Sequence, residues 1–143
     1  MVTAEQLQST LEKLLPRYPV MLAYLYGSVA DKTAGITSDI DIALVLEQGT
    51  TESESLSVEL AIAAKLDSSF TPRCTFDVRS IQSAPLAVQG EVITNGILLF
   101  SKREDMRVDF ETYVRSHYFD MRPFYAAART NFFESVIRSG LHG

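Results

Sequence analysis

The stretch VMLAYLYGSVADKTAGITSDIDIALVLE, residues 20–47, decides the fold. Its two ends, 20–27 and 39–47, are apolar runs rich in strand-forming residues, and the first of them is stopped by a glycine. The small polar residues between them predict a turn or a short helix. Two acids, Asp39 and Asp41, alternate inside the second apolar run. Charged side chains are rarely buried in a core strand unless they are paired or hold a metal, so this pair is the first clue to function.

Helical and strand patterns alternate along the rest of the chain. Helices are expected from Thr3 to Pro16, over 53–70 and 85–96, and from Arg103 onward, and strands are expected over 73–81 and 97–100. Pro123 predicts a break or kink in the last helix, with a further helix after it. The alternation predicts an α/β (α+β) fold in which helices pack on a small mixed β-sheet.

Two helix faces can be predicted from residue spacing. The helix over 53–70 is expected to present an apolar row, and the helix after Arg103 is expected to place five side chains on one face. The first row contains Leu56, Leu60, Ala63 and Ala64, and the second face contains Phe110, Tyr113, Val114, His117 and Met121.

Composition narrows the class of protein. The 143 residues are expected to form a single domain with one core, and the net charge of −5 disfavours direct nucleic-acid binding, which needs clustered basic side chains. No apolar run has the length of about 18 residues that a membrane span needs, and the N-terminus has no secretory pattern. The single cysteine, Cys74, excludes an internal disulfide, so a reducing, cytoplasmic setting is expected.

The two acids predict a cation site. Residues i and i+2 of a strand point to the same face, so Asp39 and Asp41 project side by side and repel each other unless a cation lies between them. Oxygen ligands without a histidine or cysteine cluster favour Mg²⁺. Gly27 and Ser28, at the end of the preceding strand, suit close approach to a phosphate. Asp77, the only acid of the third expected strand, is the candidate third carboxylate.

A simpler interpretation needs no chemistry. Asp39 and Asp41 alone are also compatible with a helix cap and an exposed pair on an edge strand, and Ser28 is compatible with a helix cap. The Gly-Ser pair ten residues before the acids, together with Asp77, favours phosphoryl or nucleotidyl transfer over this alternative.

These residues resemble the nucleotidyltransferase superfamily that includes DNA polymerase beta, and especially the minimal nucleotidyltransferase (MNT) antitoxins, of the MntA type, from HEPN–MNT toxin–antitoxin pairs. The resemblance extends to the Pro-Leu helix, the following Gly-Ile-Leu-Leu-Phe segment and the tail YFDMRPF. It implies a nucleotidyltransferase fold and an antitoxin that transfers AMP from ATP to a tyrosine of a partner HEPN ribonuclease, with two Mg²⁺ ions. It implies catalytic and metal-binding roles for Asp39, Asp41 and Asp77, and nucleotide-binding roles for Gly27, Ser28, Lys32 and Ser38.

The sequence departs from the family at one point and leaves two other functions open. Relatives often carry Arg-Gly where this chain has Asp31-Lys32, so Lys32 is the candidate for the missing positive charge. A catalytic core is expected over 1–100 and a helical tail over 101–143, with 118–138 docking the protein acceptor. The alternatives are an antitoxin that silences its toxin by binding alone, and a nucleotidyltransferase that acts on a small molecule.

Overall fold

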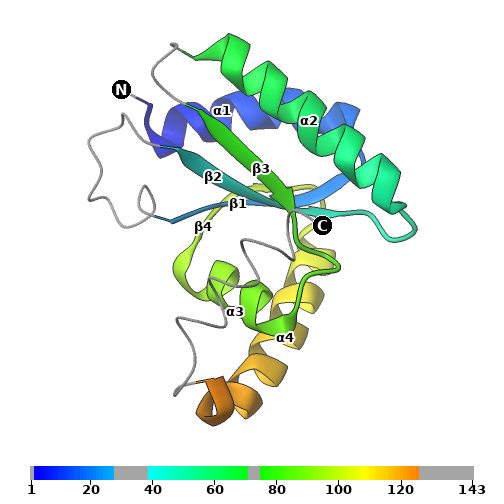
Figure 1. The fold of residues 1–143 in the computed structure, drawn as a ribbon, viewed down its shortest axis with the longest axis vertical. Helices are drawn as coiled ribbons and strands as arrows, with labels where there is room; N and C mark the ends of the chain where they lie inside the picture. The colour runs from blue at the N-terminus through cyan, green and yellow to red at the C-terminus, as the bar shows by residue number, and fades with distance from the viewer. Residues whose placement is uncertain (1, 28–38, 71–74, 126–143) are drawn as a thin grey trace.

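The computed structural model describes residues 2–27, 39–70 and 75–125, the last four of these by their backbone alone. The described elements form a four-stranded mixed sheet with helices on both faces (Figure 1). In chain order they are α1 (Ala4–Leu14), the 3-10 turn η1 (Leu15–Arg17), β1 (Val20–Tyr26), β2 (Ile40–Leu46), α2 (Glu52–Ser69), β3 (Phe76–Ser80), α3 (Leu86–Asn95), β4 (Ile97–Ser101) and α4 (Glu104–Tyr125).

The strand order is β3-β2-β1-β4. Strand β1 is antiparallel to both β2 and β4, whereas β2 is parallel to β3. The end of β1 and the starts of β2 and β3 therefore meet at one edge of the sheet. Helices α1 and α2 cover one face, and α3 and α4 cover the other (Figure 1). The predicted fold, a small mixed sheet with helices packed on it, is confirmed.

Helix α1 follows the expected local chemistry. The Thr3 hydroxyl accepts a hydrogen bond from the Gln6 backbone N–H at 3.1 Å, and the Gln6 side chain accepts one from the Thr3 N–H at 2.9 Å. This capping box satisfies two amide groups that the first helical turn leaves without partners. Leu7 and Leu11 are fully buried against the sheet. The helix ends at Leu14, and the short turn η1 that follows it contains Pro16.

The buried face of α2 differs from the predicted one. Leu56 and Leu60 are 53% and 63% exposed, so they lie on the outer side of the helix. The residues that pack inward are Ser55, Val58, Ile62 and Leu66. Apolar residues occur on both sides of this helix, so their spacing alone allowed two faces. Packing on the sheet decides between them and buries the face that carries Val58, Ile62 and Leu66.

The inner face of α4 is also displaced from the predicted one. Val114 is buried as expected, but Tyr113, His117 and Met121 are exposed. The His117 ring packs on Tyr113, and its Nδ1 atom lies 2.8 Å from the Tyr113 carbonyl oxygen. The helix passes through Pro123 without ending there and continues to Tyr125. Within the described residues, Pro123 therefore does not separate two helices.

Tyr118 fixes α4 on α3. Its ring is buried against Gly90, where an added Cβ atom would lie only 2.2 Å from the ring. Its hydroxyl donates a hydrogen bond to Glu91 at 2.7 Å. Because this side chain is committed to the interior, it is not available for the acceptor docking predicted for 118–138. Residues 126–138 of that segment lie outside the described residues, and the division into core and tail stays a prediction.

A buried carboxylate holds α4 on the sheet. Glu111 is only 6% exposed, and it accepts a hydrogen bond from the Tyr24 hydroxyl at 2.6 Å. Arg107 donates a second hydrogen bond to it at 2.9 Å, and the Arg115 guanidinium lies 3.4 Å away. Burial is the main cause that raises the pKa of the Tyr24 hydroxyl, and the Glu111 carboxylate is the second. The hydroxyl therefore stays protonated and remains a hydrogen-bond donor. The network anchors α4 directly to β1.

Candidate functional site

The three predicted acids lie at the starts of β2 and β3. Asp39 immediately precedes β2, Asp41 is the second residue of β2, and Asp77 is the second residue of β3. Asp41 and Asp77 are register partners across the parallel pair, so their side chains lie on the same face of the sheet. The backbone N–H of Ile40 donates to the Thr75 carbonyl at 2.8 Å and fixes this register at its first residue.

Tyr26 of β1 lies beside the carboxylates of β2 and β3. It is the last residue of β1 and the register partner of Asp41, so it shares the face with the carboxylates. Burial, then Asp41 and Asp77, raise the pKa of its hydroxyl, which therefore stays protonated. The sequence did not single out Tyr26, because an aromatic residue at the end of an apolar strand is also typical of a core.

The cluster carries more negative charge than its surroundings compensate. Burial raises the pKa of Asp41 to about 6, and the Asp77 and Asp39 carboxylates act in the same direction. The Arg79 guanidinium opposes this shift. Arg79 forms an ion pair with Asp77, with Nε 2.9 Å from Oδ1, and the Thr75 hydroxyl donates a hydrogen bond to Asp39. Asp39 and Asp77 thus each have a polar partner, whereas burial, followed by the two neighbouring carboxylates, disfavours the charged form of Asp41.

The donor set fits a hard divalent cation. Carboxylate oxygens, which Asp39, Asp41 and Asp77 offer, are the ligand type that Mg²⁺ prefers. Over residues 2–27, 39–70 and 75–125, however, no three acidic, histidine or cysteine side chains form a ready-made ion cluster. In the described structure, Asp77 instead forms an ion pair with Arg79.

Gly27 closes the site from the end of β1. Its φ angle is +85°, a conformation that favours glycine, and an added Cβ atom would lie 2.6 Å from Oδ2 of Asp41. Glycine therefore suits this position for two reasons: its backbone adopts a positive φ angle, and it has no Cβ atom to clash with the Asp41 carboxylate. The other predicted nucleotide-binding residues, Ser28, Lys32 and Ser38, lie outside the described residues, as does Cys74.

Replacing Gly27 by Ala is expected to destabilise the protein by about 2–3 kcal/mol, because the left-handed conformation and the contact with Asp41 both oppose a side chain. Urea denaturation measures the loss. Gly49→Ala is the matched control, because Gly49 has φ +93° but nothing within 4 Å of an added Cβ. We expect that control to cost only about 1 kcal/mol. Equal losses in both variants would show that the contact with Asp41 has no energetic consequence.

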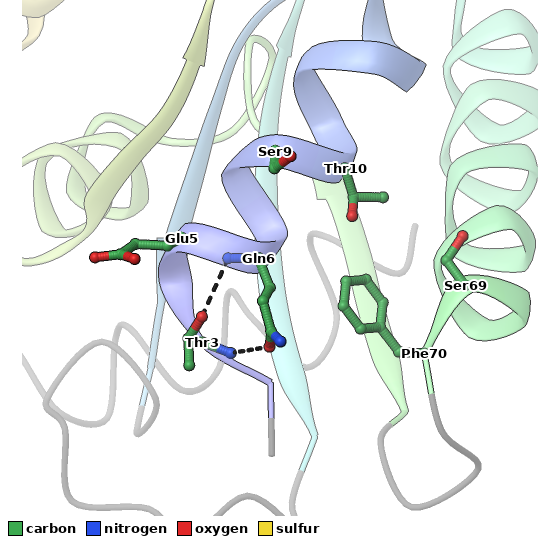
Figure 2. Close-up of a pocket in the computed structure, with 7 residues that line it drawn as sticks. All are labelled: Thr3, Glu5, Gln6, Ser9, Thr10, Ser69 and Phe70. Atoms are coloured by element: carbon green, nitrogen blue, oxygen red, sulfur yellow. Dashed lines mark hydrogen bonds between the residues drawn. The ribbon is translucent and has the colours of Figure 1, made fainter.

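A hollow among the described residues lies away from the carboxylates. It is a shallow depression of about 660 Å³ between α1 and the end of α2 (Figure 2). Thr3 and Gln6 on its rim are hydrogen-bonded to each other's backbone in the helix cap. Phe70 contributes its one aromatic wall. The hollow therefore holds helix-capping groups rather than a second set of reactive ones.

No helix among the described residues has the length and apolarity that crossing a membrane requires.

Comparison with known proteins relates most of the chain to one family. The family model described as polymerase beta, nucleotidyltransferase, matches residues 5–105. No curated protein is significantly similar to the chain.

Several solved structures share the fold. A chain in the crystal structure of a toxin–antitoxin with AMP-PNP is 23% identical, with a TM-score of 0.63, covering 88% of this chain and 98% of that one. A chain in the complex of a tri-AMPylated Shewanella oneidensis HEPN toxin with MNT antitoxin is 21% identical, with a TM-score of 0.61 and coverage of 92% and 99%. A chain of the toxin–antitoxin MntA-HepT is 22% identical, with a TM-score of 0.56 and coverage of 91% and 96%. At these identities the likeness is one of fold.

Proposed function

The chain belongs to the polymerase beta nucleotidyltransferase family, and from this premise we propose that it is a protein adenylyltransferase. In this proposal it transfers AMP from ATP to a tyrosine hydroxyl of a partner HEPN-type toxin and so acts as the antitoxin. A cytoplasmic location, in which the single cysteine stays reduced, belongs to the same proposal.

One observation carries the proposal. Asp41 and Asp77 are register partners on adjacent strands, with Gly27 packed directly against the Asp41 carboxylate. A glycine at the end of a strand, beside two acids, allows a phosphate to approach the backbone next to a candidate cation site. Neither feature alone is specific, but nucleotidyl transfer needs both of them in contact.

The residues of the chain have separable roles in this reaction. The acceptor tyrosine oxygen forms a bond to the α-phosphorus of ATP, the bond to the pyrophosphate oxygen breaks, and pyrophosphate leaves with that electron pair. Asp77 is the candidate to accept the proton that the tyrosine loses. Gly27 lets the triphosphate approach the backbone, and the predicted contacts from Ser28, Lys32 and Ser38 belong to the same proposal.

Mg²⁺ would be held by Asp39, Asp41 and Asp77. When bound, the ion neutralises charge on the phosphates and on the developing oxyanion. The carboxylates themselves would orient the ion relative to Gly27. The proposal includes two ions with nucleotide present.

A HEPN-type toxin is proposed as the acceptor on the strength of the fold relatives. Three of them are chains of toxin–antitoxin structures, one with AMP-PNP and one with a tri-AMPylated toxin.

Radiolabel transfer tests this function. The protein is incubated with ATP labelled at the α-phosphate, Mg²⁺ and the HEPN-type protein encoded beside it, and label on that protein is followed by gel and mass spectrometry. We expect AMP on a tyrosine, and loss of ribonuclease activity in step with labelling. Silencing of the toxin without label would favour the binding-only antitoxin. Label on small acceptors such as aminoglycosides, but not on the toxin, would favour the small-molecule enzyme.

A further inference from the structure

Arg79 is the one described basic residue for which the structure gives an ion pair with a predicted catalytic acid. It lies two residues after Asp77 on β3, so the two side chains share a sheet face, and Nε is 2.9 Å from Oδ1 of Asp77. The Arg79 side chain is 22% exposed and that of Asp77 is 40% exposed. The pair is therefore half-sheltered, where a charge interaction is stronger than on an open surface.

The register explains why a guanidinium fits at this point. The partner of Arg79 on β2 is Ala43, which is fully buried and carries only a methyl group. A long side chain on β3 thus meets no bulky neighbour on the adjacent strand, and the Arg79 charge acts on Asp41 as well as on Asp77. An arginine is positively charged at any pH at which the protein is folded, so this compensation does not depend on titration.

A divalent cation and Arg79 need the same carboxylate. Asp77 cannot keep a close ion pair with a guanidinium and also ligate a dication without bringing two positive charges together. We propose that Arg79 is a positioning residue that acts as the internal counter-ion of the carboxylate cluster: it holds Asp77 while the site lacks a cation and yields it when a divalent cation binds. The consequence for AMP transfer rests on the proposed function, whereas the competition with the cation does not.

Manganese binding measures the competition without nucleotide or partner. Mn²⁺ is titrated into the full-length protein and the free ion is followed by electron paramagnetic resonance. Arg79→Met removes the charge and keeps the aliphatic stem, and we expect it to tighten Mn²⁺ binding about tenfold. Arg79→Lys keeps the charge, and we expect its Mn²⁺ affinity to stay within about twofold of the wild type.

Thermal stability supplies a second readout. In EDTA, Arg79→Met is expected to lower the melting temperature by about 3 °C, because Asp77 and Asp41 lose their counter-ion, and saturating Mn²⁺ is expected to remove most of that difference. Arg103→Met is the matched control. Arg103 also pairs with an acid two residues away, Asp105, at 2.6 Å, but outside the site. That variant is expected to leave Mn²⁺ binding unchanged.

The inference is overturned if Arg79→Met binds Mn²⁺ no more tightly than Arg103→Met, or if the wild-type protein binds no Mn²⁺. It is also overturned if Arg79→Lys and Arg79→Met change the affinity equally, because the effect would then come from shape rather than charge. Failure of the proposed function is a different result: the Mn²⁺ competition is present, but no AMP reaches the toxin.

Discussion

Asp41→Asn is expected to abolish AMP transfer and, in the absence of metal, to make the protein more stable. Asp41 is the central carboxylate of the cluster, next to Asp77 in register and in contact range of Gly27. An amide has the same shape but no charge with which to hold a cation. Under the proposed function, transfer of label to the toxin falls by at least about a thousandfold.

The gain in stability follows from the pKa of Asp41, which is raised from 3.8 to about 6. The folded protein binds this proton below about pH 6, whereas the unfolded chain binds it only below about pH 4. The stability contributed by the protonated group is therefore complete below pH 4 and is lost as the pH rises through 6. Because Asp41 is only partly buried, we expect Asn to recover about 1 kcal/mol above pH 6 and nothing below pH 4.

Thermal unfolding in EDTA between pH 4 and pH 8 measures this gain, which corresponds to about 3 °C in melting temperature. Asp67→Asn is the matched control, because Asp67 is exposed on α2, away from the cluster. That control is expected to leave both label transfer and the pH profile unchanged. Wild-type transfer by Asp41→Asn would refute its role in cation binding, and a pH-independent gain would refute the charge repulsion.

Glu111→Ala is expected to cause the largest loss of stability, about 3 kcal/mol. Removing this buried carboxylate leaves the Tyr24 hydroxyl without its acceptor inside the protein, and it opens a gap between α4 and β1. Arg107 also loses a hydrogen-bond partner. Urea denaturation measures the loss, which corresponds to about 10 °C in melting temperature.

Two variants test the origin of this loss. Glu104→Ala removes another carboxylate that bonds Arg107, but one on the surface, so we expect the denaturation midpoint to stay where it is. Glu111→Gln keeps an oxygen that accepts from Tyr24, so we expect less than half the loss of Glu111→Ala. If Glu104→Ala and Glu111→Ala were equally mild, α4 would be held by its apolar contacts rather than by the buried network.

Local sequence determined the parts of this protein that depend on spacing alone. Three such features are local: the Thr3 capping box, the apolar run of β2 and the two-residue spacing of Asp39 and Asp41. Each depends on residues only a few positions apart, so backbone periodicity predicts it without any tertiary contact. The same periodicity placed Asp77 on the side of β3 opposite its buried residues, Phe76 and Val78. All three candidate acids could therefore be identified from the sequence alone.

Tertiary structure decided which surfaces meet. The α2 helix has apolar residues on two sides, and only packing on the sheet settles that Val58 and Ile62 are buried while Leu60 is exposed. A glutamate in a helix predicts a surface position, because its burial becomes favourable only with a partner such as Tyr24, which lies 87 residues away in the chain.

The same holds for the neighbours of the carboxylates. The pairing of β2 with β3 brings Arg79 beside Asp41, and the pairing of β1 with β2 brings Tyr26 there. Spacing along one strand gives the face of each side chain, but the register between strands sets the distances between charges. Spacing along the strand thus determined the acids and the pairing of Asp77 with Arg79, whereas the approach of Arg79 and Tyr26 to Asp41 was determined by the fold.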